Sequence, residues 1–240
     1  RVLMNAWKKV KANRGSGGID GVTIREYAKN EQENILKLLE KLKAKEYKPT
    51  PVRRVYIPKK DGKKRPLGIP TLEDRIVQQA LTDILMPKYE KLVFHNWSMG
   101  YRPGRGVESA LQVIIKNIEL GRNWIYDCDI KGFFDNIPHK KLMKVLNKVI
   151  ADGTVLDLIW SWLKCGYMED GKYYNTKTGQ VQGGVISPLL ANIYLNELDW
   201  ELHKAKIYFV RYADDFLLFC ETEEEVIRAG NIAKSVIESL

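Results

Sequence analysis

Two adjacent carboxylates, Asp214 and Asp215, interrupt an otherwise apolar and β-prone run that extends from residue 207 to residue 220. Neighbouring carboxylates repel each other, and each is costly to remove from water. A bound cation would relieve both costs, which makes the pair a candidate metal site. Asp is also common in turns, so the pair taken alone is equally consistent with a water-exposed hairpin turn.

A second apolar segment, residues 124–130, brings two further carboxylates. Side chains alternate between the two faces of a strand, so Asp127 and Asp129 share one face. If this strand lies against the hairpin of the acidic pair, Asp129 comes close to that pair, whereas Asp127 and Asp135 are expected to be structural. Three converging carboxylates suit Mg²⁺, and two such ions about 3.5–4 Å apart would support phosphoryl transfer.

The elements that must hold these residues follow from apolar periodicity and turn signals. Helices are predicted at residues 1–13, 23–46, 72–92, 107–120, 138–149, 155–167 and 187–203, and from residue 222 onward. Strands are predicted at residues 52–58, 64–69, 124–130, 207–212 and 216–220, with a weaker hairpin signal between residues 169 and 184. Thr23 and Thr71 have the spacing of helix N-caps. Strands and helices mixed in this order predict an α+β fold.

Positive charge is in excess, with a formal net charge of +9. Such an excess attracts polyanions, of which nucleic acid is the usual one. Eleven of the basic residues fall between Lys41 and Arg65, against only Glu46 and Asp61 as acidic residues. Because this stretch surrounds the hairpin predicted at residues 52–69, it forms a basic patch on a structured element.

The cysteines and histidines do not form a metal-binding pattern. Cys128, Cys165 and Cys220 stand far apart, and the histidines are equally scattered, so neither a zinc site nor a disulfide framework is expected. The thiols are expected to be reduced and intracellular, with Cys128 and Cys220 buried behind the acidic strands. No apolar run approaches the roughly 20 residues that span a bilayer. Arg1 already lies in a helical pattern, so we expect a piece of a longer protein.

Two motifs together resemble the palm motifs of reverse transcriptases: Asp129-Ile-Lys-Gly-Phe-Phe-Asp135 and Tyr212-Ala-Asp-Asp215. Further blocks follow the order of that family, and the last two are typical of bacterial group II intron enzymes. These blocks are Gly18-Ile-Asp-Gly-Val-Thr23, Arg65-Pro-Leu-Gly-Ile-Pro70, Met99-Gly-Tyr-Arg-Pro-Gly-Arg105 and Gln182-Gly-Gly-Val-Ile-Ser-Pro-Leu-Leu-Ala-Asn192. Val181 and Glu108 depart from the proline and histidine that are usual at these places.

The resemblance implies a right-hand polymerase fold with an antiparallel palm sheet packed on helices. The fingers would comprise residues 1–72 and 137–184. The palm, with the catalytic site, would comprise residues 73–136 and 185–240. The sequence ends shortly after the acidic hairpin, so the thumb is expected to be absent.

The resemblance also assigns roles to single residues. Asp129, Asp214 and Asp215 would be the catalytic residues. They would hold two Mg²⁺ ions, helped by the carbonyl of Ile130, with Mn²⁺ as a substitute metal.

The incoming deoxynucleotide would be bound by residues of the fingers and of the palm boundary: Lys59, Arg65, Phe134, Gln182 and Gly183. Lys59 and Arg65 would contact the triphosphate. Phe134 would either crowd a ribose 2′-hydroxyl or be a core aromatic.

Nucleic-acid contacts are implied for a set of mostly basic residues: Arg53, Arg54, Lys63, Arg102, Arg105 and Tyr212. For Arg102 and Arg105 the sequence leaves two roles open, since each could contact the template backbone or brace the palm.

The implied activity is RNA-directed DNA polymerisation, in which intron RNA is copied into cDNA, combined with help in splicing. The partners would be an RNA template, a DNA primer, dNTPs and intron RNA in the bacterial cytoplasm, with no membrane. The oligomeric state is open, a homodimer being one option. Three alternatives remain. They are an RNA-binding splicing cofactor without polymerase activity, a reverse transcriptase of a CRISPR, retron-like or diversity-generating system, and an RNA-directed RNA polymerase.

Overall fold

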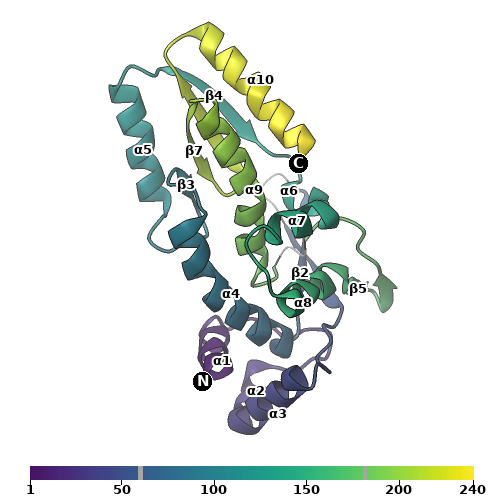
Figure 1. Ribbon diagram of the computed structural model, residues 1–240. Helices are drawn as coiled ribbons and strands as arrows, with labels where there is room; N and C mark the ends of the chain where they lie inside the picture. Colours follow the sequence, from purple (N-terminus) through teal and green to yellow (C-terminus); the bar gives the residue numbers. More distant parts are fainter. Residues whose placement is uncertain (59–61, 181–182) are drawn as a thin grey trace. The chain divides into compact units, whose positions relative to one another are not determined.

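The computed structural model describes residues 1–58, 62–180 and 183–240 (Figure 1). The chain divides into two compact units. The first unit comprises Arg1–Met86 and Phe134–Ser187, and the second comprises Pro87–Phe133 and Pro188–Leu240. The first boundary falls inside helix α4 (Leu72–Leu92), at its internal Pro87. The division expected from the sequence is interleaved too, with boundaries after residues 72, 136 and 184. That these units are fingers and palm stays a prediction.

The N-terminal helices of the first unit are α1 (Val2–Ala12), α2 (Ile24–Lys29) and α3 (Glu31–Lys43). Thr23 begins α2 as predicted, because its hydroxyl accepts from the Glu26 N–H while the Glu26 carboxylate accepts from the Thr23 N–H. The single helix expected at residues 23–46 is wrong. Asn30, at φ −130° and ψ 41°, interrupts it. Asparagine is unfavourable inside helices because its side chain hydrogen-bonds nearby backbone groups in non-helical conformations.

The first sheet has the strand order β2-β1-β5-β6. Strands β1 (Val52–Pro58) and β2 (Lys64–Ile69) pair antiparallel, which confirms the predicted hairpin. Strands β5 (Tyr167–Glu169) and β6 (Lys172–Tyr174) form a second hairpin, and β5 pairs parallel to β1. Helices α7 (His139–Leu146) and α8 (Gly153–Lys164) complete this unit, together with the first part of α4.

The start of α4 is fixed by a buried carboxylate. Asp74 accepts hydrogen bonds from the hydroxyls of Tyr47 at 2.5 Å, Thr50 at 2.7 Å and Thr71 at 2.9 Å. The Thr71 hydroxyl accepts in turn from the Asp74 N–H, as an N-cap does. The predicted cap is therefore present. The same carboxylate also ties the segment before β1 to the helix.

The second sheet has the order β3-β7-β8-β4 and lies between helices. Its strands are β3 (Ser98–Met99), β4 (Trp124–Asp129), β7 (Tyr208–Tyr212) and β8 (Asp215–Cys220). Helix α5 (Val107–Glu119) packs on one face, where its Ala110 meets Val210 and Phe219.

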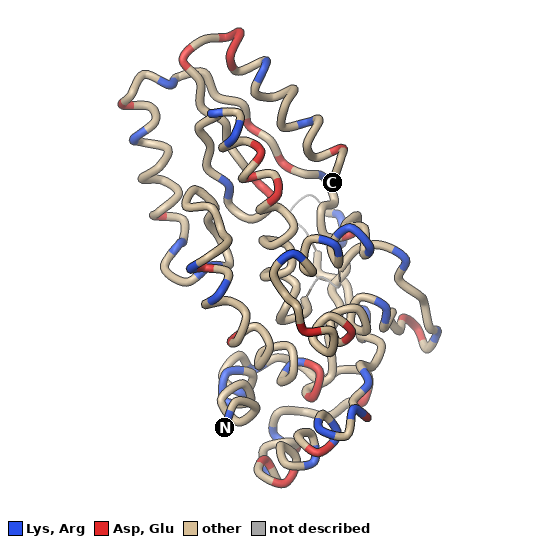
Figure 2. Tube along the Cα trace, in the orientation of Figure 1, with Lys and Arg blue, Asp and Glu red and all other residues tan. Residues whose placement is uncertain are grey.

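Helices α9 (Ser187–Lys204) and α10 (Glu223–Ser239) cover the other face of the second sheet (Figure 1). On this side Gly230 of α10 passes so close to Tyr126 of β4 that an added Cβ would lie 2.6 Å from the ring. Short α6 (Phe133–Asn136) links the two units. Lys and Arg recur in segments of both units (Figure 2). Within the described ranges, no helix is long and apolar enough to cross a membrane.

Candidate active site

The acidic strand and the acidic hairpin meet in the second unit. Strand β4 pairs antiparallel with β8, in a register that places Asp129 directly opposite Asp215. Directly opposite residues in an antiparallel ladder project to the same face. Asp214 lies in the turn between β7 and β8, and its carbonyl accepts from the N–H of Ile130 at 3.4 Å. The convergence expected from the sequence is confirmed at the level of the strands.

The carboxylates of this cluster repel one another. The pKa of Asp215 is raised above its ordinary value, first by partial burial and then by the negative charges of Asp214 and Asp129. A hydrogen bond with the Asp129 side chain and the charge of Asp127 act in the same direction. The mutual repulsion of these carboxylates is therefore an electrostatic cost, which a bound cation would reduce.

The donor set fits a divalent cation, because carboxylate and carbonyl oxygens are the ligands that Mg²⁺ prefers. The side-chain positions, however, do not form a complete metal site among the described residues. Among the residues with assigned positions, no three His, Cys, Asp or Glu side chains are arranged to hold a metal ion. The carbonyl of Ile130 already accepts from the N–H of Phe133 at 3.2 Å. The metal-binding roles of these residues thus stay predictions.

The turn that carries Asp214 is held in an uncommon conformation. Ala213 has φ +57°, a left-handed conformation that costs a residue with a Cβ about 1–2 kcal/mol. Its N–H donates to the Met99 carbonyl at 3.1 Å, and its own carbonyl accepts from Arg211 at 2.8 Å. Gly100 follows Met99 at φ +79°, and a Cβ there would lie 3.1 Å from the Ala213 nitrogen. Both backbone groups of Ala213 are therefore fixed.

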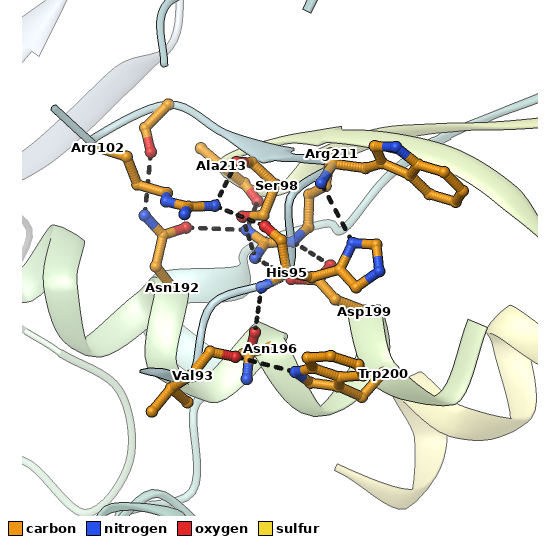
Figure 3. Close-up of polar contacts among 12 residues, drawn as sticks. Val93, His95, Ser98, Arg102, Asn192, Asn196, Asp199, Trp200, Arg211 and Ala213 are labelled. Atoms are coloured by element: carbon orange, nitrogen blue, oxygen red, sulfur yellow. Dashed lines mark hydrogen bonds and ion pairs between the residues drawn. The ribbon is translucent and has the colours of Figure 1, made fainter. Parts of the chain in front are cut away.

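Arg211 is the centre of this arrangement (Figure 3). Its guanidinium is fully buried and forms a bidentate pair with Asp199 of α9, at 2.7 Å and 2.5 Å. The remaining N–H groups donate to the Asn192 side chain, the Ser98 hydroxyl and the Ala213 carbonyl. All five donors of the guanidinium are therefore satisfied. The sequence reasoning missed this residue. Its signal was a lone Arg inside the apolar strand 207–212.

Arg102 and Arg105 brace the second unit. Arg102 donates to both Glu90 oxygens, at 2.7 Å and 2.9 Å, and to the carbonyl of His95, with its side chain fully excluded from solvent. Arg105 donates to the carbonyl and side chain of Asn96. Of the two roles that the sequence left open, these contacts favour bracing for both, and for Arg102 they leave no surface for a template.

The other residues expected to contact nucleic acid differ in their surroundings. Arg53 donates to the Gly17 carbonyl at 2.8 Å, and Arg54 lies 3.8 Å from the centre of the Tyr167 ring. Both arginines thus support the first unit. Lys63 is exposed beside β2, and Tyr212 is 38% exposed at the end of β7. Lys63 and Tyr212 therefore keep side-chain surface that a nucleic acid could contact.

The nucleotide-binding candidates belong to the first unit. Arg65 is exposed on β2, whereas Phe134 is buried, in agreement with a core position. Gly183 has φ +107°, and a Cβ there would lie 2.5 Å from the Gly68 carbonyl oxygen. Glycine is therefore required because the β2 backbone approaches it. Lys59 and Gln182 lie outside the described residues.

The cysteine prediction is right for one thiol and wrong for the other. Cys128 and Cys220 lie on the sheet face opposite Asp129 and Asp215, because they alternate with these residues along β4 and β8. Cys220 is buried, as expected, but Cys128 is only half-buried. The reason is that β4 is an edge strand whose other side chains are exposed. All three cysteines are unpaired.

Comparison with known proteins identifies relatives whose similarity covers most of the chain. Residues 57–240 match the family described as reverse transcriptase (RNA-dependent DNA polymerase). The group II intron-encoded protein LtrA of Lactococcus lactis is 42% identical over 208 residues, which cover 85% of this chain and 34% of LtrA. The protein YkfC of Escherichia coli is 34% identical, over 92% of this chain and 68% of YkfC. This chain thus spans about a third of LtrA.

Solved structures agree with the fold. A chain of the Cas6-RT-Cas1--Cas2 complex superposes with a TM-score of 0.58 and 22% identity, over 99% of this chain and 25% of that chain. At this identity the likeness concerns the fold alone. The family match, by contrast, includes both acidic strands and the turn between β7 and β8. The chain belongs to the reverse transcriptase (RNA-dependent DNA polymerase) family and is related to group II intron-encoded proteins.

Proposed function

We propose that this chain is the fingers-and-palm part of an RNA-directed DNA polymerase of a group II intron, which copies intron RNA into cDNA. The observation that carries the proposal is the pairing of Asp129 with Asp215, next to the turn that holds Asp214. A module that only binds a polyanion gains nothing from focused negative charge. A nucleotidyltransferase needs it to hold cations against phosphate.

The proposed reaction joins the 3′-hydroxyl of a primer to the α-phosphate of a dNTP and releases pyrophosphate. Asp129, Asp214, Asp215 and the Ile130 carbonyl would hold two Mg²⁺ ions, with Mn²⁺ as a substitute. When bound, these ions lower the pKa of the attacking hydroxyl and neutralise the triphosphate. The chain itself contributes fixed positions, since Asp129 and Asp215 stand on paired strands. Positioning supplies much of the rate enhancement in such reactions.

The nucleotide is proposed to bind on the first unit. Arg65, exposed on β2, together with Lys59 would contact the triphosphate, because Lys and Arg are natural phosphate binders. Gln182 and Gly183 would lie beside the nucleotide, whereas the burial of Phe134 favours a core position over a role in crowding a ribose 2′-hydroxyl. In this assignment the first unit corresponds to the fingers and the second to the palm.

The partners proposed are an RNA template, a DNA primer, dNTPs and the intron RNA, in the bacterial cytoplasm. The net charge of +9 supports a polyanionic partner. Exposed Lys63 and Arg65 beside the β1–β2 hairpin supply positive charge where a strand could be held.

The test is primer extension on an RNA template by the full-length parent protein and its Asp214→Ala variant. Extension should require both Mg²⁺ and dNTPs and should be lost in the variant. Asp127→Asn serves as the matched control, because Asp127 lies on the same strand face but opposite Leu217 rather than a carboxylate. Extension that persists in Asp214→Ala would refute the assignment of the acidic hairpin.

A second candidate function is RNA binding in splicing without polymerisation. The observation that favours it is the basic stretch from Lys41 to Arg65, which fits a binder as well as an enzyme. A folded parent protein that binds intron RNA tightly but extends no primer would select this function.

A further inference from the structure

We propose that Arg211 is a positioning residue for the acidic turn: its guanidinium, neutralised by Asp199, locks the Ala213 carbonyl and so fixes the presentation of Asp214 and Asp215. The inference rests on the proposed function, because it assigns Arg211 a part in presenting the catalytic carboxylates. Arg211 does not touch the reacting atoms itself.

The geometry separates Arg211 from an ordinary core ion pair. Its Nη1 reaches two acceptors at once, the Asn192 side chain at 2.9 Å and the Ala213 carbonyl at 2.8 Å. Asn192 in turn donates to the Gly100 carbonyl at 3.0 Å. Gly100 lies beneath the turn, against the Ala213 nitrogen. This hydrogen-bond network connects helix α9, strand β7 and the segment after β3 to the peptide group between Ala213 and Asp214 (Figure 3).

That peptide group immediately precedes the acidic pair. A left-handed Ala213 persists only where its surroundings determine it more strongly than its own preference. Three hydrogen bonds determine it here. Arg211 donates to the Ala213 carbonyl, and the Ala213 N–H donates to the Met99 carbonyl. The Ile130 N–H donates to the carbonyl of the next residue, Asp214. Arg211 supplies the only side-chain contact of these three. Its removal should therefore release the turn while β7 and β8 stay paired.

The positive charge of Arg211 is balanced by Asp199, so the guanidinium does not compete with a metal ion for the carboxylates of the acidic turn. Asp199 and Arg211 are both fully excluded from solvent, and both carboxylate oxygens bond the guanidinium. The pair therefore adds little net field at Asp214. Its part in the site is rigid hydrogen-bond geometry, which a lysine cannot reproduce because it lacks the planar fork.

The experiment uses the full-length parent protein with Arg211→Lys, which keeps the charge that Asp199 needs. The matched control is Asn196→Ala, since Asn196 lies on α9 four residues from Asn192 and accepts from the N–H of His95, away from the turn. A double variant, Arg211→Met with Asp199→Leu, removes both buried charges and guards against misfolding of the single variant.

Two measurements are made on each variant. Backbone hydrogen exchange of the segment 212–215 should become about tenfold faster or more in Arg211→Lys and in the double variant, but not in Asn196→Ala. In primer extension, the Mg²⁺ concentration for half-maximal rate should rise and kcat should fall, by about 10- to 100-fold, as for residues that orient metal ligands. The KM for the primer–template should not change.

The outcomes separate the two proposals. If the parent protein extends no primer, the proposed function fails, and hydrogen exchange still decides whether Arg211 holds the turn. Exchange that is unchanged in a folded Arg211→Lys, or that rises equally in Asn196→Ala, overturns the positioning role. Failure of both Arg211 variants to fold also overturns it, since the pair would then act only in the stability of the unit.

Discussion

Asp129 and Asp215 stand directly opposite each other on β4 and β8, so two carboxylates share one cross-strand position on one sheet face. Like charges at such a position destabilise a sheet. The pKa of Asp215 is raised first by its partial burial and then by the negative charges of Asp214 and Asp129. The pair therefore lowers the stability of the sheet at the place where the proposed divalent cation would be held. Replacing one of the two carboxylates consequently tests both the stability of the sheet and the proposed activity.

Replacing Asp129 by Asn should stabilise the metal-free protein and abolish primer extension. The gain should be up to about 1 kcal/mol in the free energy of unfolding, the range of cross-strand pair energies. Urea unfolding in EDTA measures it. Asp127→Asn is the control and should gain less, because the charge of Asp127 is the smallest of the contributions that raise the pKa of Asp215. Full extension by Asp129→Asn would contradict the assignment.

Mg²⁺ should raise the melting temperature of the parent protein. A ligand that binds only the folded state stabilises it by RT ln(1 + [L]/Kd), so the stabilisation increases with the Mg²⁺ concentration. Thermal melts at increasing Mg²⁺, with ionic strength held constant by NaCl, measure the effect. Asp214→Ala should melt at a temperature that does not depend on Mg²⁺. An equal Mg²⁺ dependence in both proteins would place the cation elsewhere.

Asp74→Ala should destabilise the first unit by about 3 kcal/mol or more. The change leaves the hydroxyls of Tyr47, Thr50 and Thr71 without their acceptor, and hydrogen bonds to a charged group contribute about 1.5–3 kcal/mol each. Denaturant unfolding followed by Trp fluorescence measures the loss. Asp74→Asn keeps one acceptor oxygen and should lose clearly less. Equal losses in the two variants would show that the carboxylate oxygens are not what stabilises the start of α4.

The stability of the first unit should decrease as the pH falls from about 7 toward 5. The pKa of His139 is lowered, chiefly by burial, while its Nε2 donates to the Gly179 carbonyl. The unfolded chain therefore takes up a proton below the ordinary His pKa of about 6.5 before the folded chain does. The stability that neutral His139 contributes to the folded state is therefore fully present above the ordinary His pKa and is lost as the pH falls through and below it.

Urea unfolding at pH steps between 7.5 and 5 measures this dependence. His139→Gln keeps an N–H donor for Gly179 but cannot be protonated, so its curve should be flatter. A slope that His139→Gln leaves unchanged would assign the pH dependence of the first unit to groups other than His139.

Replacing Lys63 and Arg65 together by Ala should weaken RNA binding in a salt-dependent way. If each contacts one phosphate of a single strand, the slope of log K against log salt should fall by about 1.4, at about 0.7 per contact. Filter binding between 50 and 300 mM KCl, about the range in which such contacts dominate, measures it. Arg102→Lys is the control, because a buried brace should alter stability and leave the salt slope unchanged.

Much of the fold could be predicted from the sequence because its signals are local. The β1–β2 hairpin and the caps at Thr23 and Thr71 depend on residues a few positions apart, and the structure has each of them. The break at Asn30 could not be predicted from apolar periodicity, which runs through it. The parallel pairing of β5 with β1 was not predictable either, since the two strands are distant in sequence.

For the candidate site, the sequence by itself determined the acidic residues, their strands and the family, because motifs in order carry that information. Only the tertiary structure decided that Asp129 lies opposite Asp215, that Arg102 is a brace, and that Arg211, paired with Asp199, donates to the Ala213 carbonyl. The physical reason is that a buried guanidinium must find acceptors for every donor. Which acceptors it finds depends on how α9 packs against β7, and no local pattern specifies that packing.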